Sequence, residues 1–253
     1  MHPNPFRPRG FSLIEMMVVI AIVGVLTAMS VAAYQEIGTA SAAQNAVNEM
    51  VGAMVRARAR AAERQTDVWV VVHPGFDKRA NSLSGGEGAY FVFEDKKLNF
   101  NAASAGALAS GDVSYRWVGG ISFSPLSSGQ LSGTNGKLID SAIFEEHPGR
   151  SVKMDIPGAG FTLGPTEAPF AGMSVTSGCS FCSIGPLGAP RGAIVFSPDG
   201  SARFIDGVGL PAAASGAGTA NRAHSIALSS KKKHRLYVVA VSGPTAFIGA
   251  FKK

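Results

Sequence analysis

The first quarter of the sequence lacks the residues that interrupt or charge a helix. No proline lies between Pro8 and Pro74, and no charged side chain lies between Met16 and Ala33. Proline breaks helix interiors, so its absence permits one continuous helix over about 11–64. Over the whole chain only 16% of residues are charged, with 31 glycines. This composition excludes a charged disordered tail and is typical of a loop-rich β domain.

The chain also lacks the motifs of common catalytic and metal centres. It has two cysteines and five histidines, and no histidine stands at a ligand spacing. A structural zinc site needs about four ligands, which one Cys-x-x-C does not supply. There is no Gly-x-Ser-x-Gly elbow, His-Glu-x-x-His or P-loop, and the glycine-rich stretch 158–164 is one residue too long for a dinucleotide fingerprint. The sequence predicts no enzymatic activity, no cofactor and no metal.

A long apolar run from Phe11 to Ala33 is the feature around which the chain is organised. As a helix rising about 1.5 Å per residue, it is long enough to cross a hydrocarbon core of about 30 Å. Arg7 and Arg9 lie just before it, and no basic cluster follows closely. The positive-inside tendency therefore predicts a cytoplasmic N-terminus and an exported remainder.

Glu15 is the one charged residue within this run. A carboxylate inside a membrane helix is costly and usually has a partner and a function. The alternative is that Glu15 lies at the membrane interface and stays hydrated. A cleaved secretory signal peptide fits poorly, because the helical pattern continues beyond the apolar run.

The sequence Gly10-Phe11-Ser12-Leu13-Ile14-Glu15 resembles the processing site of type IV prepilins and type II secretion pseudopilins. The resemblance implies that a prepilin peptidase cuts after Gly10 and methylates the new N-terminus at Phe11. It implies an inner-membrane protein that works with an assembly platform and joins other pilins or pseudopilins in a helical fibre. Its head would lie in the periplasm.

The same resemblance gives Glu15 a role in subunit assembly. Cleavage leaves an α-amino group on Phe11, whose ordinary pKa of about 7.7–8.0 keeps it mostly cationic. In a bundle of such helices this cation can pair with Glu15 of a neighbouring subunit. Either charge alone in an apolar interior would cost several kcal/mol, so the pair would enforce the axial step between subunits.

The helical pattern continues beyond the membrane segment as a stripe at i, i+3, i+4, i+7 and i+8, formed by Val47, Met50, Val51, Met54 and Val55. Such a stripe predicts a helix face packed on a folded domain. We therefore expect a cleaved leader over 1–10, a helix over 11–64 with 11–33 in the membrane, and an exported β-rich head over 65–253. The fold class is α+β, with a long helix packed on a mainly antiparallel sheet.

The remainder of the chain carries strand patterns rather than helical ones. Strands are expected at 68–73, 89–93, 113–118, 142–145, 151–156, 225–228, 236–241 and 246–251. Glycine- and alanine-rich loops are expected at 101–111 and 127–136.

A hairpin over 193–205 has the turn Pro198-Asp199-Gly200, in which proline presets φ and glycine accepts positive φ. It resembles the hairpin of the GspH/FimT-type minor pseudopilins. The head is longer than is usual in that group, which suggests insertions within 101–192.

Cys179 and Cys182 form a Cys-x-x-C. If the head is exported, the oxidising compartment favours a local disulfide. A redox-active pair would need a following helix N-terminus, and the Gly185-Pro186 sequence argues against one.

The basic cluster Lys231, Lys232, Lys233 and Arg235, with Lys252 and Lys253, is a rival functional signal. It could contact phosphates of DNA, although a solvated hairpin turn explains it as well. Loss of the leader removes Arg7 and Arg9, leaving 21 of the 23 Lys and Arg residues against 17 Asp and Glu, a mild net charge of +4. The sequence thus favours a structural minor pseudopilin or minor pilin that supports protein secretion, with a DNA-binding minor pilin as the alternative.

Overall fold

The computed structural model divides the chain into two compact units, residues 1–39 and 40–253. It describes residues 12–77, 84–94, 137–144, 152–185, 188–212, 223–230 and 235–253. The expected strand at 113–118 and the loops at 101–111 and 127–136 lie outside the described residues.

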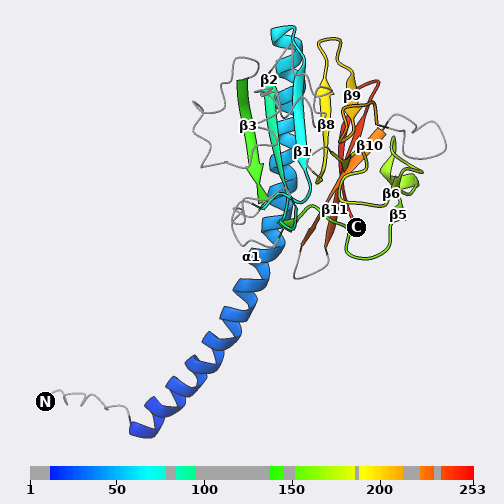
Figure 1. The fold of residues 1–253 in the computed structure, drawn as a ribbon. Helices are drawn as coiled ribbons and strands as arrows, with labels where there is room; N and C mark the ends of the chain where they lie inside the picture. The colour runs from blue at the N-terminus through cyan, green and yellow to red at the C-terminus, as the bar shows by residue number, and fades with distance from the viewer. Residues whose placement is uncertain are drawn as a thin grey trace, which may run out of the picture. The chain divides into compact units, whose positions relative to one another are not determined.

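The helix α1 spans Leu13–Arg64 and runs through both units (Figure 1). It starts after Ser12, whose hydroxyl accepts a hydrogen bond from the Glu15 N–H. It ends where Gln65 turns to a φ of 53°, the left-handed region common just beyond a helix C-terminus. The one continuous helix expected from the absence of proline is therefore present over Leu13–Arg64.

In the second unit, one face of α1 is buried against the strands. The buried residues are Ala43, Ala46, Val47, Met50, Ala53, Met54, Ala57 and Ala61. The predicted stripe was wrong at Val55, which is 52% exposed. The face instead follows the alanines, because small side chains let a helix approach a sheet closely.

The first sheet has the order β3-β2-β1-β8-β7, with β9 paired to β8, and every pairing is antiparallel. Its strands are β1 (Val68–His73), β2 (Ala89–Glu94), β3 (Lys137–Ile143), β7 (Ser183–Ile184), β8 (Pro190–Phe196) and β9 (Ala202–Ile205). The strand predicted at 142–145 is the end of β3, which begins five residues earlier.

The β8–β9 hairpin forms where the Pro-Asp-Gly turn predicted it. Gly200 has a φ of 84°, and Asp199 Oδ1 accepts hydrogen bonds from the N–H and the hydroxyl of Ser201. The turn thus supplies its own partners and sets the register that places Phe196 opposite Ala202.

The second sheet has the order β12-β11-β10-β4 and is also antiparallel. Its strands are β4 (Val152–Lys153), β10 (Ala223–Ser230), β11 (Leu236–Ser242) and β12 (Ile248–Lys252). The strand predicted at 151–156 was too long, since only two residues pair with β10. A small lobe with β5 (Phe161–Thr162), the 3₁₀ turn η3 (Pro165–Glu167) and β6 (Ser174–Val175) follows β4.

Three apolar cores hold the second unit together. The largest lies between α1 and both sheets and includes Met50, Val70 and Val239. A second covers the opposite face of the first sheet around Phe91. The third packs the lobe, through Phe170, onto the second sheet. The described fold is therefore α+β, a helix packed on mainly antiparallel sheets, as predicted.

The helix face gives a direct stability test. Met54 is fully buried and Val55 is exposed, so Met54→Ala should lower the free energy of unfolding by about 2–5 kcal/mol. Val55→Ala, the matched control, should change it by less than about 0.5 kcal/mol. Denaturant unfolding of the full chain in detergent micelles measures both. Equal losses would contradict the assigned face.

Candidate functional site

The first turn of α1 forms a capping box between Ser12 and Glu15. The Glu15 N–H donates to Ser12 Oγ at 3.3 Å, and the Ser12 N–H donates to Glu15 Oε2 at 3.4 Å. These bonds satisfy two of the donors that a helix leaves free at its start. The Glu15 carboxylate also lies near the positive end of the helix dipole. Gly10 and Phe11 lie outside the described residues.

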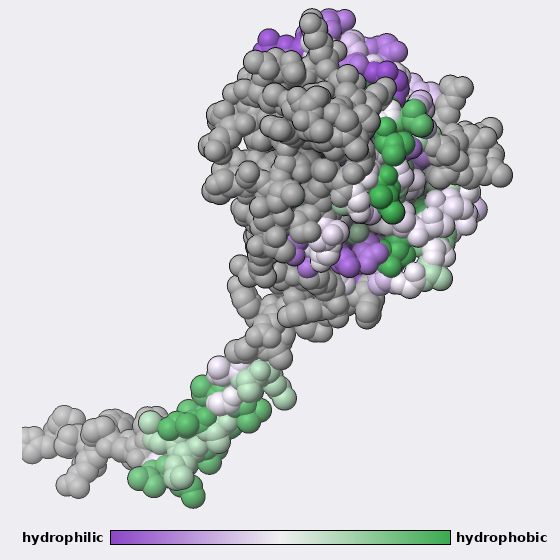
Figure 2. All heavy atoms as spheres, viewed as in Figure 1, coloured by the Kyte–Doolittle hydropathy of each residue, from purple (hydrophilic) through white to green (hydrophobic). Residues whose placement is uncertain are grey.

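The side chains that follow Glu15 are apolar and exposed. From Leu13 to Ser30 none of the helix is buried, and this is the one helix in the described part of the chain that is long and apolar enough to span a membrane. Figure 2 shows this stretch as a green surface. The hydroxyls of Thr27 and Ser30 donate to the carbonyls of Val23 and Leu26, so they present little polarity. A surface of this kind requires an apolar environment.

Cys179 and Cys182 form a disulfide, with their Cα atoms 5.4 Å apart. The bond lies where the chain passes from the second sheet to the first. On one side, Ser180 N–H donates to the Ser225 carbonyl of β10. On the other, Ser183 pairs with Arg191 of β8. The disulfide therefore closes the crossover between the two sheets.

Within the crossover, Phe181 packs between the sheets. Its ring centroid lies 5.7 Å from that of Phe204 on β9 and 5.9 Å from that of His224 on β10. It also lies over Gly192 of β8, where an added Cβ would come within 2.7 Å of the ring. A glycine is thus needed at 192 to admit Phe181.

His224 is the buried polar member of this cluster. Its ring is 4.4 Å from that of Phe204, and its Nδ1 lies 3.1 Å from Ser180 Oγ. Ser180 Oγ already accepts the Ser225 N–H. The tautomer of the imidazole decides whether Ser180 Oγ or Nδ1 is the donor of this bond. Burial lowers the pKa of His224 to about 4, so the imidazole is neutral at ordinary pH.

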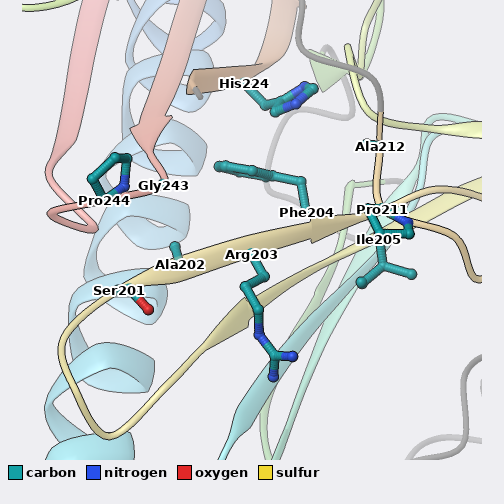
Figure 3. Close-up of a pocket in the computed structure, with 10 residues that line it drawn as sticks. All are labelled: Ser201, Ala202, Arg203, Phe204, Ile205, Pro211, Ala212, His224, Gly243 and Pro244. Carbon is teal, nitrogen blue, oxygen red and sulfur yellow. The ribbon is translucent and has the colours of Figure 1, made fainter. Parts of the chain in front are cut away.

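A pocket of about 410 Å³ lies beside this cluster (Figure 3). Its lining includes Phe204 and His224, with Pro211 on one side and Gly243 and Pro244 of the β11–β12 turn on the other. The Ala202 N–H donates to the Gly243 carbonyl and links the two sheets at this point. Sequence patterns did not identify this cluster, because residues 180, 204 and 224 carry no shared motif.

The structure describes only part of the basic cluster predicted to contact an anionic polymer. Lys231, Lys232 and Lys233 lie outside the described residues. Arg235 is partly buried at the start of β11, and Lys253 Nζ forms an ion pair with Glu167 Oε1. This ion pair lowers the pKa of Glu167. Lys253 is thus engaged with the lobe, and the expected contact of the basic cluster with an anionic polymer stays a prediction.

No group of three His, Cys, Asp or Glu side chains in the described part of the chain is arranged to hold a metal ion. Several described carboxylates are engaged in turns and surface ion pairs, such as those of Asp140 with Arg56 and Glu94 with Arg60. These ion pairs tie α1 to β2 and β3.

Comparison with known families gives one match. Residues 6–31 match the family model of the prokaryotic N-terminal methylation motif. No curated protein and no solved structure matches the chain significantly. The match falls on the stretch that contains the Gly10-Phe11 junction, Glu15 and the exposed apolar helix.

These observations place the N-terminal stretch in a class, that of apolar helices that carry the prokaryotic N-terminal methylation motif. The chain is type IV pilin-like or pseudopilin-like, as predicted from its first residues. Pilin-type proteins are structural rather than enzymatic, assemble with other pilins and are processed by a prepilin peptidase. The apolar helix fits an inner-membrane anchor. The match does not reach the narrower GspH/FimT-type group.

The disulfide generates a stability prediction. Closing so short a loop should stabilise the fold by about 2 kcal/mol through the unfolded state. Replacing Cys179 and Cys182 together by Ser should lose about that amount, measured by denaturant unfolding of the full chain. A reducing agent should weaken the unchanged chain similarly and leave the double variant unaffected. A variant as stable as the parent would contradict the role of the crossover bond.

His224 generates a pH prediction. Its folded pKa of about 4 lies below the ordinary value of 6.5, so the unfolded chain takes up a proton first as pH falls. The contribution of neutral His224 to the free energy of unfolding is fully present above pH 6.5. It is lost as pH falls from 6.5 to 4, which lowers the free energy of unfolding by about 3 kcal/mol. Unfolding of the parent and of His224→Asn at pH 7, 5.5 and 4 tests this. The gap between the two variants should shrink as pH falls; a constant gap would refute it.

Proposed function

We propose that this protein is a minor pseudopilin or minor pilin, a structural subunit of a type II secretion pseudopilus or type IV pilus. The observation that carries the proposal is the exposed apolar start of α1, which bears Glu15 within a matched methylation motif. Prepilin peptidase cuts after Gly10 and methylates Phe11. The helix then serves as membrane anchor first and as fibre core later.

The physical reason lies in the two environments that the helix must enter. Twelve large apolar side chains between Leu13 and Ser30 are at least 49% exposed: Leu13, Ile14, Met16, Met17, Val18, Val19, Ile20, Ile22, Val23, Val25, Leu26 and Met29. Lipid covers such a surface in the membrane. In a fibre, the helices of neighbouring subunits cover it instead, which is why transfer from membrane to fibre costs little apolar exposure.

Glu15 supplies the specificity of that transfer. Within the capping box its carboxylate is held at the helix start, four residues after Phe11, on which processing creates an α-amino group. The protonated α-amino group of a neighbouring subunit can replace the Ser12 N–H, which is 3.4 Å away, as the partner of the Glu15 carboxylate. Such a contact joins subunits head to tail, and repeated head-to-tail contacts generate a helical filament. The pair therefore favours one axial step over others.

The domain organisation follows the same proposal. Residues 1–10 form the leader, 11–64 the helix with 11–33 in the membrane, and 65–253 the exported head. The N-terminus faces the cytoplasm and the head faces the periplasm. The β8–β9 hairpin, with its Pro-Asp-Gly turn, supports the narrower GspH/FimT-type assignment, and the head has no catalytic role.

Two substitutions test the proposal in cells. Gly10→Ala should block leader removal, so the chain should keep its full length on a gel. Glu15→Ala should be processed normally but recovered at least about a hundredfold less in sheared fibres, the loss that several kcal/mol for one unpaired charge corresponds to. Ser30→Ala is the matched control, because its hydroxyl bonds only to its own helix.

Normal processing of the Gly10 variant would refute the cleavage site. Normal recovery of the Glu15 variant would refute the charge pair. A deletion strain separates the two systems: failure to secrete exported enzymes indicates a pseudopilus, and loss of surface fibres alone indicates a pilus.

A further inference from the structure

The last strand, β12, forms one edge of the second sheet. We propose that an extended segment of a different fibre subunit, carrying an acidic side chain, adds to this edge as a further strand. This proposal rests on the proposed function, because it names a contact through which the head would join its neighbours.

The hydrogen-bond register shows which backbone groups of β12 are available. The Ser242 N–H donates to the Phe247 carbonyl, and the Lys253 N–H donates to the Leu236 carbonyl. In an antiparallel pair, residues alternate between bonding to the partner strand and pointing away from it. Residues 247, 249, 251 and 253 therefore bond to β11, while the N–H and C=O groups of 248, 250 and 252 point outward. Among the described residues no strand pairs with that side.

The edge is held in an extended form by aromatic packing on one face. The ring of Phe170 lies over Gly249, where an added Cβ would come within 3.0 Å of it. Phe170 also contacts Phe247 and Phe251, each with ring centroids 5.9 Å away. The lobe thus packs against one face of β12 and holds the strand extended. Because the edge is already formed, β12 itself loses little conformational entropy when another strand pairs with it.

The exposed side chains indicate the chemistry of the incoming segment. Lys252 is exposed and forms no salt bridge in the described part of the chain, and Arg235 lies at the same end of the edge. Phe247 is 47% exposed at the other end. An extended segment with an acidic side chain near Lys252 and an apolar one near Phe247 complements this pattern.

Fibre polarity argues for a different subunit rather than a second copy. Two β12 strands paired antiparallel are related by a two-fold axis perpendicular to the sheet, which reverses one head relative to the other. Subunits whose N-terminal helices enter the same membrane share one direction. A second copy paired at this edge would reverse the part of α1 that packs on the sheet, against the single direction that a fibre of one polarity needs.

Ala250 allows the edge to be blocked without disturbing the fold. Its N–H points outward, so Ala250→Pro removes a donor and adds a ring on the docking side while sparing the bonds to β11. Recovery of the full chain in sheared fibres should fall about tenfold, the effect of one or two lost hydrogen bonds. Ala250→Val, which keeps the N–H, should be recovered normally. The melting temperature in detergent should match the parent for both.

If Ala250→Pro has a lower melting temperature than the parent, recovery of Lys252→Glu and of its control Lys252→Arg in sheared fibres tests the proposal instead, since neither substitution changes a backbone hydrogen-bonding group. Lower recovery of the Glu variant alone supports an acidic partner. Normal recovery of Ala250→Pro with a parental melting temperature, or of Lys252→Glu, overturns the proposal. So does a dimer of purified chain in detergent that Ala250→Pro abolishes, because it identifies a second copy. In each case the parent must appear in sheared fibres; its absence refutes the proposed function instead.

Discussion

The structure depends on one helix, α1, whose two parts need different surroundings. Over Leu13–Ser30 every side of α1 is exposed and apolar, so it needs lipid or other helices around it. From Ala43 onward only one face is apolar, and it packs into the core shared by both sheets. Because α1 is continuous, the anchor and the folded part of the chain cannot be separated at residue 64, where the helix ends, without removing a wall of the main core. Residue 39, where the compact unit ends, is the physical boundary.

The joint between the two sheets is the second constraint. The sheets share α1 on one face but pair with one another through few backbone bonds, of which the bond from Ala202 to Gly243 is one. Phe181 fills the remaining space, and the disulfide and Gly192 allow it to do so. A neutral, buried His224 completes this packing. The joint is therefore apolar and oxidised, which suits a head outside the cytoplasm.

Several parts of the fold were predictable because their signals are local. Helix continuity follows from the absence of proline, and the β8–β9 turn follows from Pro-Asp-Gly. The strands at 68–73 and 89–94 follow from β-branched and aromatic runs. The errors have non-local causes. Val55 looks apolar on a helical wheel, but the sheet selects the alanine face. The run at 151–156 looks like a strand, but only two of its residues reach β10.

The sequence by itself determined the anchor: an uninterrupted apolar helix, one carboxylate at its start and a processing motif before it. These features lie next to one another in the sequence, so they can be interpreted without knowing the tertiary structure. Only the tertiary structure decided what surrounds the disulfide, that Lys253 pairs with Glu167, and that β12 has one side without a partner strand among the described residues. Each of these depends on contacts between residues far apart in the chain, and such contacts are set by how the sheets close on α1.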